Sequence, residues 1–274
     1  MKTRVCVSGA TGWAGTDLVK AIVESDDLEL TGAVSPSQKG KNIGEFHDGT
    51  IDLTISGSVE EALRQPADVL IDFTRPEAVK GNVLSAIEKQ VHAVIGTSGL
   101  TEEDYAVIDR LARERNVGVL AAGNFAITAV LLQKFAELAA RFVPSWEIID
   151  YSHEHKPDAP SGTARELANR LHRITVSEKA IPIEKTIGLK EARGATLNGS
   201  QVHSIRLPGY VLSAEIVFGA RDERLSIRHD AGSSAAPYVE GALIAARRVG
   251  SFTGLKRGLD AVLDFNAGAS TFNG

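Results

Sequence analysis

Hydrophobic residues in the first half of the chain gather in short β-rich runs, and those at residues 67–73 and 92–95 are nearly continuous and are each followed by a stretch with apolar positions at helical spacing. Continuous apolar runs of this length are typical of parallel strands that are covered on both faces. The pattern predicts strands at residues 2–8, 28–34, 67–73, 92–95 and 117–122. It predicts helices that end near residue 25 and that span residues 76–89 and 102–116.

The pattern changes after a helix expected at residues 129–141. Strands rich in β-branched and aromatic residues follow, with an antiparallel character, and a helix is expected at residues 162–173. Residues 174–200 have little periodicity and are predicted to form a long loop. A helix at residues 241–248 and an apolar tail at residues 259–265 complete the chain. The second-half strands are predicted at residues 146–152, 202–207, 214–219 and 224–230.

These patterns predict an α/β protein. Its N-terminal part should be a Rossmann dinucleotide-binding domain, because strands and helices alternate. Its central part should be an α+β substrate and oligomerisation domain with an open mixed sheet. A sheet with one uncovered face commonly becomes an interface between subunits, so a homo-oligomer is expected.

Composition narrows the possible partners. The chain is 43% hydrophobic and 24% charged, with a net charge of −5, which argues against nucleic acid or an anionic membrane as the main partner. Cys6 is the single cysteine, so no disulfide framework exists and a reducing cytoplasm is expected. No apolar run approaches the length of a membrane span, and the N-terminus lacks the apolar region of a signal peptide.

A glycine-rich turn follows the first predicted strand. Its Gly-x-x-Gly-x-x-Gly spacing, between a strand and a helix, is typical of dinucleotide-binding proteins. Gly9 should make the tight turn, Gly12 should let the backbone approach a pyrophosphate, and Gly15 should let helix and strand pack closely. The predicted pyrophosphate-binding residues are Gly9, Ala10, Thr11, Gly12, Trp13, Ala14 and Gly15.

The end of the second predicted strand should meet the adenosine ribose. A site that prefers NAD usually places Asp or Glu there, whereas this chain has Ser35 followed by a polar loop that contains Lys39 and Lys41. The absent carboxylate and the two lysines favour a 2′-phosphate. NADPH is therefore the expected cofactor, with NADH possible.

Most of the titratable chemistry lies in residues 151–164, between a predicted strand and a predicted helix. His153, His155 and Lys156 supply cationic or titratable donors just before a helix start at Ser161, Gly162 and Thr163. The N–H groups and the dipole of such a helix end attract an anion. The segment therefore predicts a carboxylate or phosphate site beside a proton donor. A capped helix start behind a solvated loop is the alternative interpretation.

The stretch Lys-x-Asp-x-Pro-Ser-Gly-Thr-Ala, which begins at Lys156, resembles the substrate loop of 4-hydroxy-tetrahydrodipicolinate (dihydrodipicolinate) reductases. Similar motifs cover the whole chain, including the loops that meet the nicotinamide in that family. The resemblance implies domains at residues 1–127 with 236–274 and at residues 128–235, a homotetramer, and a role in diaminopimelate and lysine biosynthesis. It also implies NAD(P)H-dependent reduction of a dicarboxylate. The nicotinamide loops that it implies contain Phe73, Thr74, Gly96, Thr97, Ser98, Gly123, Asn124 and Phe125.

One departure from the family pattern concerns the proton donor. The family has two adjacent histidines before the lysine, and the first of them falls on Ser152 while the second falls on His153. A hydroxyl is a far weaker acid than an imidazolium with a pKa of about 6.5. We therefore expect the catalytic residues to be Lys156, as the leading donor, His153 and Ser152, with Tyr151 or water as alternatives. Lys156 and His153 should also bind one substrate carboxylate, and Ser161, Gly162 and Thr163 the other.

Two other readings of the sequence remain open. The chain could be a paralogue that reduces a different cyclic imine or enamine acid, or a nucleotide-binding homologue without turnover. Its intact substrate loop argues against the second of these. Histidines and carboxylates near residue 153 lack the spacing of a metal site, so no metal is expected.

Overall fold

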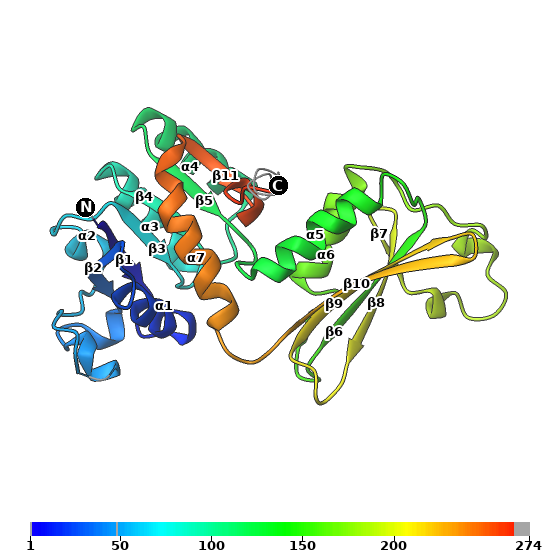
Figure 1. The fold of residues 1–274 in the computed structure, drawn as a ribbon, viewed down its shortest axis with the longest axis horizontal. Coiled ribbons are helices and arrows are strands. Elements are labelled where there is room, and N and C mark those ends of the chain that lie inside the picture. Colours follow the sequence, from blue (N-terminus) through cyan, green and yellow to red (C-terminus); the bar gives the residue numbers. More distant parts are fainter. Residues whose placement is uncertain (1, 48, 266–274) are drawn as a thin grey trace, which may run out of the picture. The chain divides into compact units, whose positions relative to one another are not determined.

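The computed structural model describes residues 2–47 and 49–265, and the chain divides into two compact units (Figure 1). Residues up to Ile127 and from Ala235 onward form the first unit, and Thr128–Ser234 forms the second. The chain thus leaves the first unit once and returns to it once. Residues 266–274, which the sequence assigns to the dinucleotide domain, lie outside the described part of the chain.

The first unit is built on a six-stranded sheet in which all adjacent strands are parallel. Its strand order is β11-β5-β4-β3-β1-β2. The strand nearest the C-terminus is absent from the sequence prediction, because it is short and carries two exposed charged residues at its end. The strands are β1 (Thr3–Ser8), β2 (Leu28–Val34), β3 (Val69–Asp72), β4 (His92–Ile95), β5 (Gly118–Ala121) and β11 (Gly254–Arg257).

Helices connect these strands, and local sequence signals set where they begin. Thr101 and Asp104 form a reciprocal capping box at the start of one helix, and proline occupies the first turn of two others. One of these proline-led helices begins at Ala236, five residues earlier than its apolar pattern predicts. The helices are α1 (Trp13–Val23), α2 (Val59–Ala62), α3 (Pro76–Glu88), α4 (Glu102–Glu114) and α7 (Ala236–Arg248).

Strand β1 lies between β2 and β3, so the chain turns to opposite sides of β1 in its first two crossovers. In open parallel sheets, a ligand crevice forms at the carboxyl ends of the strands where the order reverses in this way. The loops after Ser8 and Asp72, the last residues of β1 and β3, therefore flank the expected cofactor position.

The second unit contains a five-stranded mixed sheet of order β10-β9-β6-β8-β7. The antiparallel pairing that the sequence suggests is wrong for one pair, since β6 and β8 run parallel. A crossover that includes a helix separates these two strands in sequence, which permits parallel pairing. Strand β7 lies within the segment predicted to be a loop. The strands are β6 (Trp146–Ser152), β7 (Ala195–Leu197), β8 (Ser200–Arg206), β9 (Leu212–Ala220) and β10 (Glu223–Ala231).

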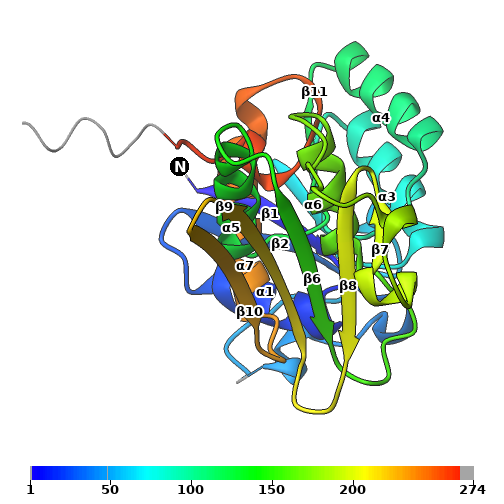
Figure 2. The same cartoon turned by 90° about the vertical axis from the view of Figure 1, so that its right-hand side faces the viewer.

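Helices α5 (Ile127–Ala139) and α6 (Gly162–His172) cover one face of this sheet. The core between the helices and the sheet contains Trp146, Leu167 and Phe218, and the Trp146 indole N–H donates to the Ser200 hydroxyl at 2.9 Å. Figure 2 shows the sheet face-on, and no described α-helix of this unit lies on its other face. The open sheet that the sequence predicts is therefore present.

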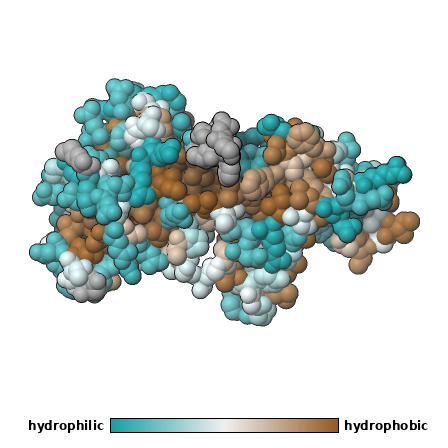
Figure 3. Space-filling view, viewed as in Figure 1, coloured by the Kyte–Doolittle hydropathy of each residue, from teal (hydrophilic) through white to brown (hydrophobic). Residues whose placement is uncertain are grey.

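Hydrophobic side chains also gather over α5 (Figure 3). Phe135 and Leu138 of α5 are exposed, and so is Phe142 just after it, although α5 buries its opposite side in the core. Within the described part of the chain, no helix is both long enough and apolar enough to span a membrane.

Candidate active site

The glycine turn joins β1 to α1. Gly9 has φ +85°, and a Cβ atom there would lie 2.1 Å from the carbonyl oxygen of Phe73. A Cβ atom on Gly15 would lie 1.9 Å from the carbonyl oxygen of Gly9, so the helix packs directly against the turn. Gly12 caps α1 without a side chain, and the first turn of α1 contains no acidic residue. The free N–H groups of this helix end can therefore face a pyrophosphate.

The end of β2 reaches the same turn. The Ser35 hydroxyl lies 2.7 Å from the Thr11 hydroxyl, which brings together two of the predicted cofactor residues. Lys39 pairs with Glu61 at 3.0 Å, and this bond lowers the pKa of Glu61. Lys41 instead lies over the ring of Phe46, 6.0 Å from its centre. The charge of Lys39 is thus already matched by a carboxylate.

Asp72 is fully buried at the end of β3 and links two loops. One carboxylate oxygen accepts hydrogen bonds from the hydroxyls of Thr74 and Thr97, each at 2.7 Å. The other accepts from the Asn82 amide at 2.8 Å. The sequence leaves open whether Asp72 contacts a cofactor or bonds within its own loop. In the structure it bonds its own loop and the next one.

Aromatic packing shapes the same edge of the sheet. The rings of Phe73 and Phe125 lie 5.5 Å apart, centre to centre. A Cβ atom on Gly96 would lie 2.3 Å from the Phe73 ring, so only glycine fits against it. The loops after β3, β4 and β5 are therefore held together by side-chain contacts as well as by strand pairing.

The remaining predicted nicotinamide residues follow β4 and β5. Ser98 and Gly123 are exposed, and Asn124 is buried. The side-chain oxygen of Asn124 accepts a hydrogen bond from the backbone N–H of Ala126 at 2.8 Å. This bond leaves the Asn124 amide N–H groups available to a ligand.

In the second unit, Ser161 is the N-cap of α6 and accepts a hydrogen bond from the Ala164 N–H at 3.3 Å. Gly162 is exposed, Thr163 is half-buried, and no acidic residue occupies the first turn. Their backbone N–H groups belong to the turn that has no acceptor within the helix. The predicted anion site is therefore an open helix N-terminus.

Lys156 lies in the loop before this helix, with about a quarter of its side chain exposed. Its ammonium group is 2.7 Å from Asp158, and this bond lowers the pKa of the Asp158 carboxyl. The choice of Lys156 as the leading proton donor rests on burial beside a second cation. The structure instead places the Asp158 carboxylate beside its ammonium group. His153 is exposed in the same loop. Lys156 is thus held in position and partly open to solvent.

Ser152 and Tyr151 lie on opposite faces of β6. Ser152 is fully buried, and its hydroxyl donates to the Val211 carbonyl at 2.8 Å. Tyr151 points to the open face, where its hydroxyl donates to Glu215 at 2.9 Å. Burial raises the pKa of Tyr151, and the bond to Glu215 raises it further. Neither hydroxyl is directed to the substrate loop as a free proton donor.

Residues 203–209 resemble a second motif of the family, and the sequence leaves open whether His203 and Arg206 serve the site or only the sheet. Asp150 was not predicted as a site residue. In the structure, Asp150 and Arg206 both bond the loop that precedes α6. His203, from the same sequence motif as Arg206, instead bonds Glu147 at 2.8 Å on the open face. The alternation of side chains along β8 could have separated the two.

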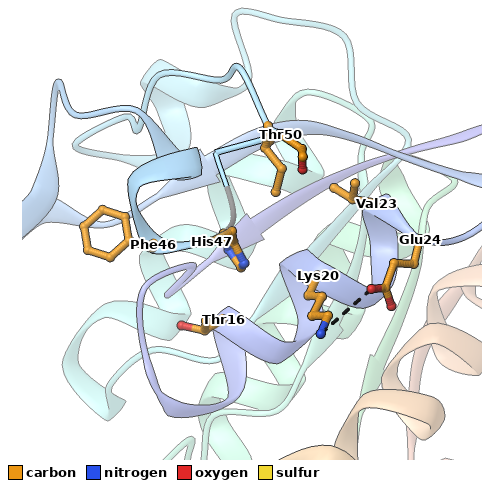
Figure 4. A pocket seen from close by; sticks show the side chains of 8 residues that line it. Thr16, Lys20, Val23, Glu24, Phe46, His47 and Thr50 are labelled. Carbon is orange, nitrogen blue, oxygen red and sulfur yellow. Dashed lines mark ion pairs between the residues drawn. The ribbon is translucent and has the colours of Figure 1, made fainter.

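A hollow of about 320 Å³ lies beside α1, between that helix and the segment that contains His47 (Figure 4). Lys20 and Glu24, paired at 3.9 Å, lie on its helical side, and Phe46 lies on the other. None of the predicted cofactor residues lines it. We therefore do not assign this hollow to the cofactor.

The predicted site residues form two groups. The dinucleotide residues surround the carboxyl ends of β1 to β5 in the first unit, and the substrate residues surround the start of α6 in the second. The first unit has a parallel sheet with a glycine turn after β1, and the second has a mixed sheet and a loop that can bind an anion. Together these features define a nicotinamide-dependent oxidoreductase.

Comparison with known proteins identifies the family. The family described as "Dihydrodipicolinate reductase, N-terminus" matches residues 3–125, and "Dihydrodipicolinate reductase, C-terminus" matches residues 128–263. The chain therefore belongs to the dihydrodipicolinate reductase family, whose members are NAD(P)H-dependent oxidoreductases. The predicted family and fold class are confirmed.

Individual relatives agree with this placement. A 4-hydroxy-tetrahydrodipicolinate reductase of Desulfitobacterium hafniense is 38% identical over 96% of this chain and 99% of its own length. One from Listeria monocytogenes is 36% identical over 95% of this chain and 100% of its own. The structure of "Dipicolinate bound Dihydrodipicolinate reductase" from Paenisporosarcina sp. TG-14 matches with a TM-score of 0.83 and 31% identity, covering 96% of this chain and 100% of that one. An amine dehydrogenase from Mycobacterium smegmatis, with a TM-score of 0.68 and 13% identity, covers 96% of this chain and 97% of that one and shares only the fold.

Proposed function

We propose that this protein reduces 4-hydroxy-tetrahydrodipicolinate to tetrahydrodipicolinate with NAD(P)H, as a step of diaminopimelate and lysine biosynthesis. The observation that carries the proposal is the open N-terminus of α6 beside Lys156, in a chain of this family. Two anion-binding groups in one loop suit a ligand with two carboxylates.

The reaction consumes one hydride and one proton, and the 4-hydroxyl group of the substrate leaves as water. Reduced nicotinamide supplies the hydride. The protein must therefore bind both carboxylates, hold the ring still and deliver a proton. The dinucleotide residues of the first unit fit the cofactor, because the glycines let the turn pack tightly against α1 and the loop after β3, and the N–H groups at the start of α1 have no side-chain cap.

We assign one carboxylate to the N–H groups of Gly162 and Thr163 with the Thr163 hydroxyl. The other is assigned to Lys156 and His153. An ammonium group has three donors, so Lys156 can bond Asp158 and a substrate carboxylate together. Lys156 is also our leading proton donor, since the hydroxyl hydrogen of Ser152 is given to Val211.

The direct test is oxidation of NADPH in the presence of 4-hydroxy-tetrahydrodipicolinate, generated in the cuvette by the enzyme that makes it. A panel of other cyclic imine acids should be assayed beside it. We expect kcat/KM for the family substrate to exceed every other value. A higher kcat/KM on another imine would assign the protein to a paralogous reaction, and no turnover on any of them would contradict the proposal.

Removal of the Ser152 hydroxyl should have little effect on catalysis. We expect Ser152→Ala to keep kcat within about 3-fold of wild type, because this hydroxyl bonds a backbone carbonyl and not the substrate. The free energy of unfolding should fall by about 1 kcal/mol for the lost buried hydrogen bond. Steady-state kinetics and urea denaturation measure the two effects. A large loss of kcat with unchanged stability would place Ser152 in the proton path.

The preference for NADPH is a second part of the proposal, supported by the absence of a carboxylate at Ser35. We expect Lys41→Ala to reduce the ratio of NADPH to NADH affinity by about 5-fold at low salt, because an exposed lysine contributes about 1 kcal/mol or less to binding a phosphate. Lys39→Ala is the matched control and should change the ratio less, since Glu61 already pairs with Lys39. Equal affinities of the wild-type protein for NADPH and NADH would contradict the proposed preference.

We also propose that the protein works in the cytoplasm as a homotetramer. The uncovered face of the second sheet supports the assembly, because Tyr151 and Tyr210 stack there at 5.1 Å and Arg228 lies over the Tyr151 ring. Light scattering coupled to size-exclusion chromatography would measure the mass, and a monomer at micromolar concentration would contradict the assembly.

A further inference from the structure

Asp150 is a carboxylate with no exposed surface, on the helix-covered face of β6 beneath the substrate loop. One of its oxygens accepts three hydrogen bonds. They come from the backbone N–H of Ser161 at 2.8 Å, the Ser204 hydroxyl at 3.2 Å and the guanidinium of Arg206 at 2.8 Å. Asp150 therefore fixes Ser161, the residue that caps α6, through its backbone N–H.

Arg206, the last residue of β8, holds the loop at a second point. The guanidinium nitrogen that bonds Asp150 also donates to the backbone carbonyl of Asp158 at 2.6 Å. Asp150 and Arg206 thus fix both ends of the short segment from Asp158 to Ser161, which carries the chain into α6. Lys156 is connected to the same segment through its ion pair with Asp158.

A contribution to the free energy of folding does not explain why Asp150 and Arg206 form a largely buried ion pair here. Taking two charges out of water is costly, and apolar residues of similar volume are often as stable in such a place. The other oxygen of Asp150 and the Nε of Arg206 are buried, and neither has a hydrogen-bond partner among the described residues, which raises the cost. By contrast, Glu147 on the opposite face of β6 pairs with Arg193 and His203 where all three side chains are partly exposed.

The arrangement has two consequences for an anion site. First, the N–H of Ser161 already donates to Asp150. The helix N–H groups that remain for a ligand are therefore those of Gly162 and Thr163. Second, an unpaired carboxylate below that site would repel a carboxylate of the ligand, and the charge of Arg206 cancels it.

We propose that Asp150 and Arg206 are a positioning pair for the substrate carboxylate. Asp150 orients the start of α6 through Ser161, while Arg206 anchors Asp158 and neutralises Asp150. Neither residue touches the substrate. This inference rests on the proposed function, because it names what aligns the dicarboxylate site.

The test is the affinity for pyridine-2,6-dicarboxylate, measured by calorimetry on the full-length protein with NADPH bound. We expect Asp150→Asn to weaken binding by about 10-fold, the scale of one hydrogen bond to a charged group. Arg206→Gln should weaken it further, to about 100-fold, because it also leaves the Asp150 charge exposed to the ligand. In the double variant, neutralising Asp150 should recover part of that loss. Glu147→Gln, on the same strand, is the matched control and should stay within about 2-fold of wild type.

A merely structural role would predict a different pattern. In that case the two single substitutions would lower the affinity for pyridine-2,6-dicarboxylate equally. The double variant would bind this ligand at least as weakly as Arg206→Gln does. That pattern, or single variants that bind within about 2-fold of wild type, would overturn the proposal. Binding of NADPH alone should not change in any variant.

A second measurement separates this inference from the proposed function. If wild-type protein did not bind the dicarboxylate, the proposed function would fail, but the loop could still be examined without ligand. Amide hydrogen exchange of residues 158–164 should be faster in Asp150→Asn than in wild type, and Glu147→Gln should match wild type. Unchanged exchange in Asp150→Asn would overturn the positioning role. If Arg206→Gln failed to fold, Asp150→Asn alone would carry both measurements.

Discussion

Lys156→Met should lower kcat/KM for 4-hydroxy-tetrahydrodipicolinate by about 1,000-fold or more. Two losses combine in this estimate: a charged hydrogen bond to a carboxylate, worth about 10-fold to 100-fold, and a general acid, worth about 100-fold or more. The ammonium group is positioned for both roles, since its bond to Asp158 holds it within the loop that precedes α6. Steady-state kinetics with saturating NADPH would measure the effect.

Two further variants sharpen this test. Lys156→Arg keeps a positive charge but is a poor proton donor, so kcat should fall while KM stays within a few-fold of wild type. Lys179→Met is the matched control, because Lys179 lies in the same unit and, among the described residues, donates to backbone carbonyls and not to a carboxylate. A wild-type rate in Lys156→Met would show that the reaction does not depend on this loop.

Gly15→Ala should abolish tight cofactor binding. A Cβ atom at residue 15 would lie 1.9 Å from the carbonyl oxygen of Gly9, so α1 and the turn would have to separate. We expect the Kd for NADPH to rise by at least about 100-fold, since the backbone surface for the pyrophosphate would be displaced, with overpacking costing about 1–3 kcal/mol of stability. Fluorescence titration and thermal unfolding measure the two effects.

Gly81→Ala is the control for this substitution. Gly81 lies in α3, and a Cβ atom there would have no neighbour within 4 Å. Alanine should stabilise that helix by up to about 1 kcal/mol and leave NADPH binding unchanged. If Gly15→Ala bound NADPH as wild type does, the glycine turn would not be the pyrophosphate site.

The parallel sheet was predictable because its strands carry their own signal. Strand β2 begins and ends at the predicted residues, although it lies at the other edge of the sheet and exposes Glu29. Strand β4 does so too, and its last three residues are apolar and buried, as expected for a strand covered on both faces. Strand β11 was not predictable for the opposite reason. It lies at the edge of the sheet beside β5 and keeps two charged residues exposed, so its sequence resembles a loop.

In the candidate site, too, features encoded by neighbouring residues could be predicted, and features that depend on contacts between distant residues could not. Lys156 and the start of α6 could be identified because their motif is contiguous in sequence. The roles of Asp150 and Arg206 could not, because these residues meet only where β6 pairs with β8, 56 residues apart in sequence. The two strands run parallel, whereas the sequence pattern in this half of the chain suggested antiparallel strands. Ser152 was recognised as a departure from the family, but the acceptor of its hydroxyl is the carbonyl of Val211, 59 residues away and just before β9, which is another distant contact.

The chain leaves the first unit once and returns to it once, so the second unit is an insertion in the sequence of the first. Thr128 and His229, near its two ends, meet at 3.0 Å, so the entering and leaving segments are joined within the unit itself. The parallel sheet is completed by β11 after the return, without a strand from the inserted part. Residues 128–234 are therefore an insertion that adds no strand to the parallel sheet, so a substitution within them leaves the strand pairing of that sheet intact.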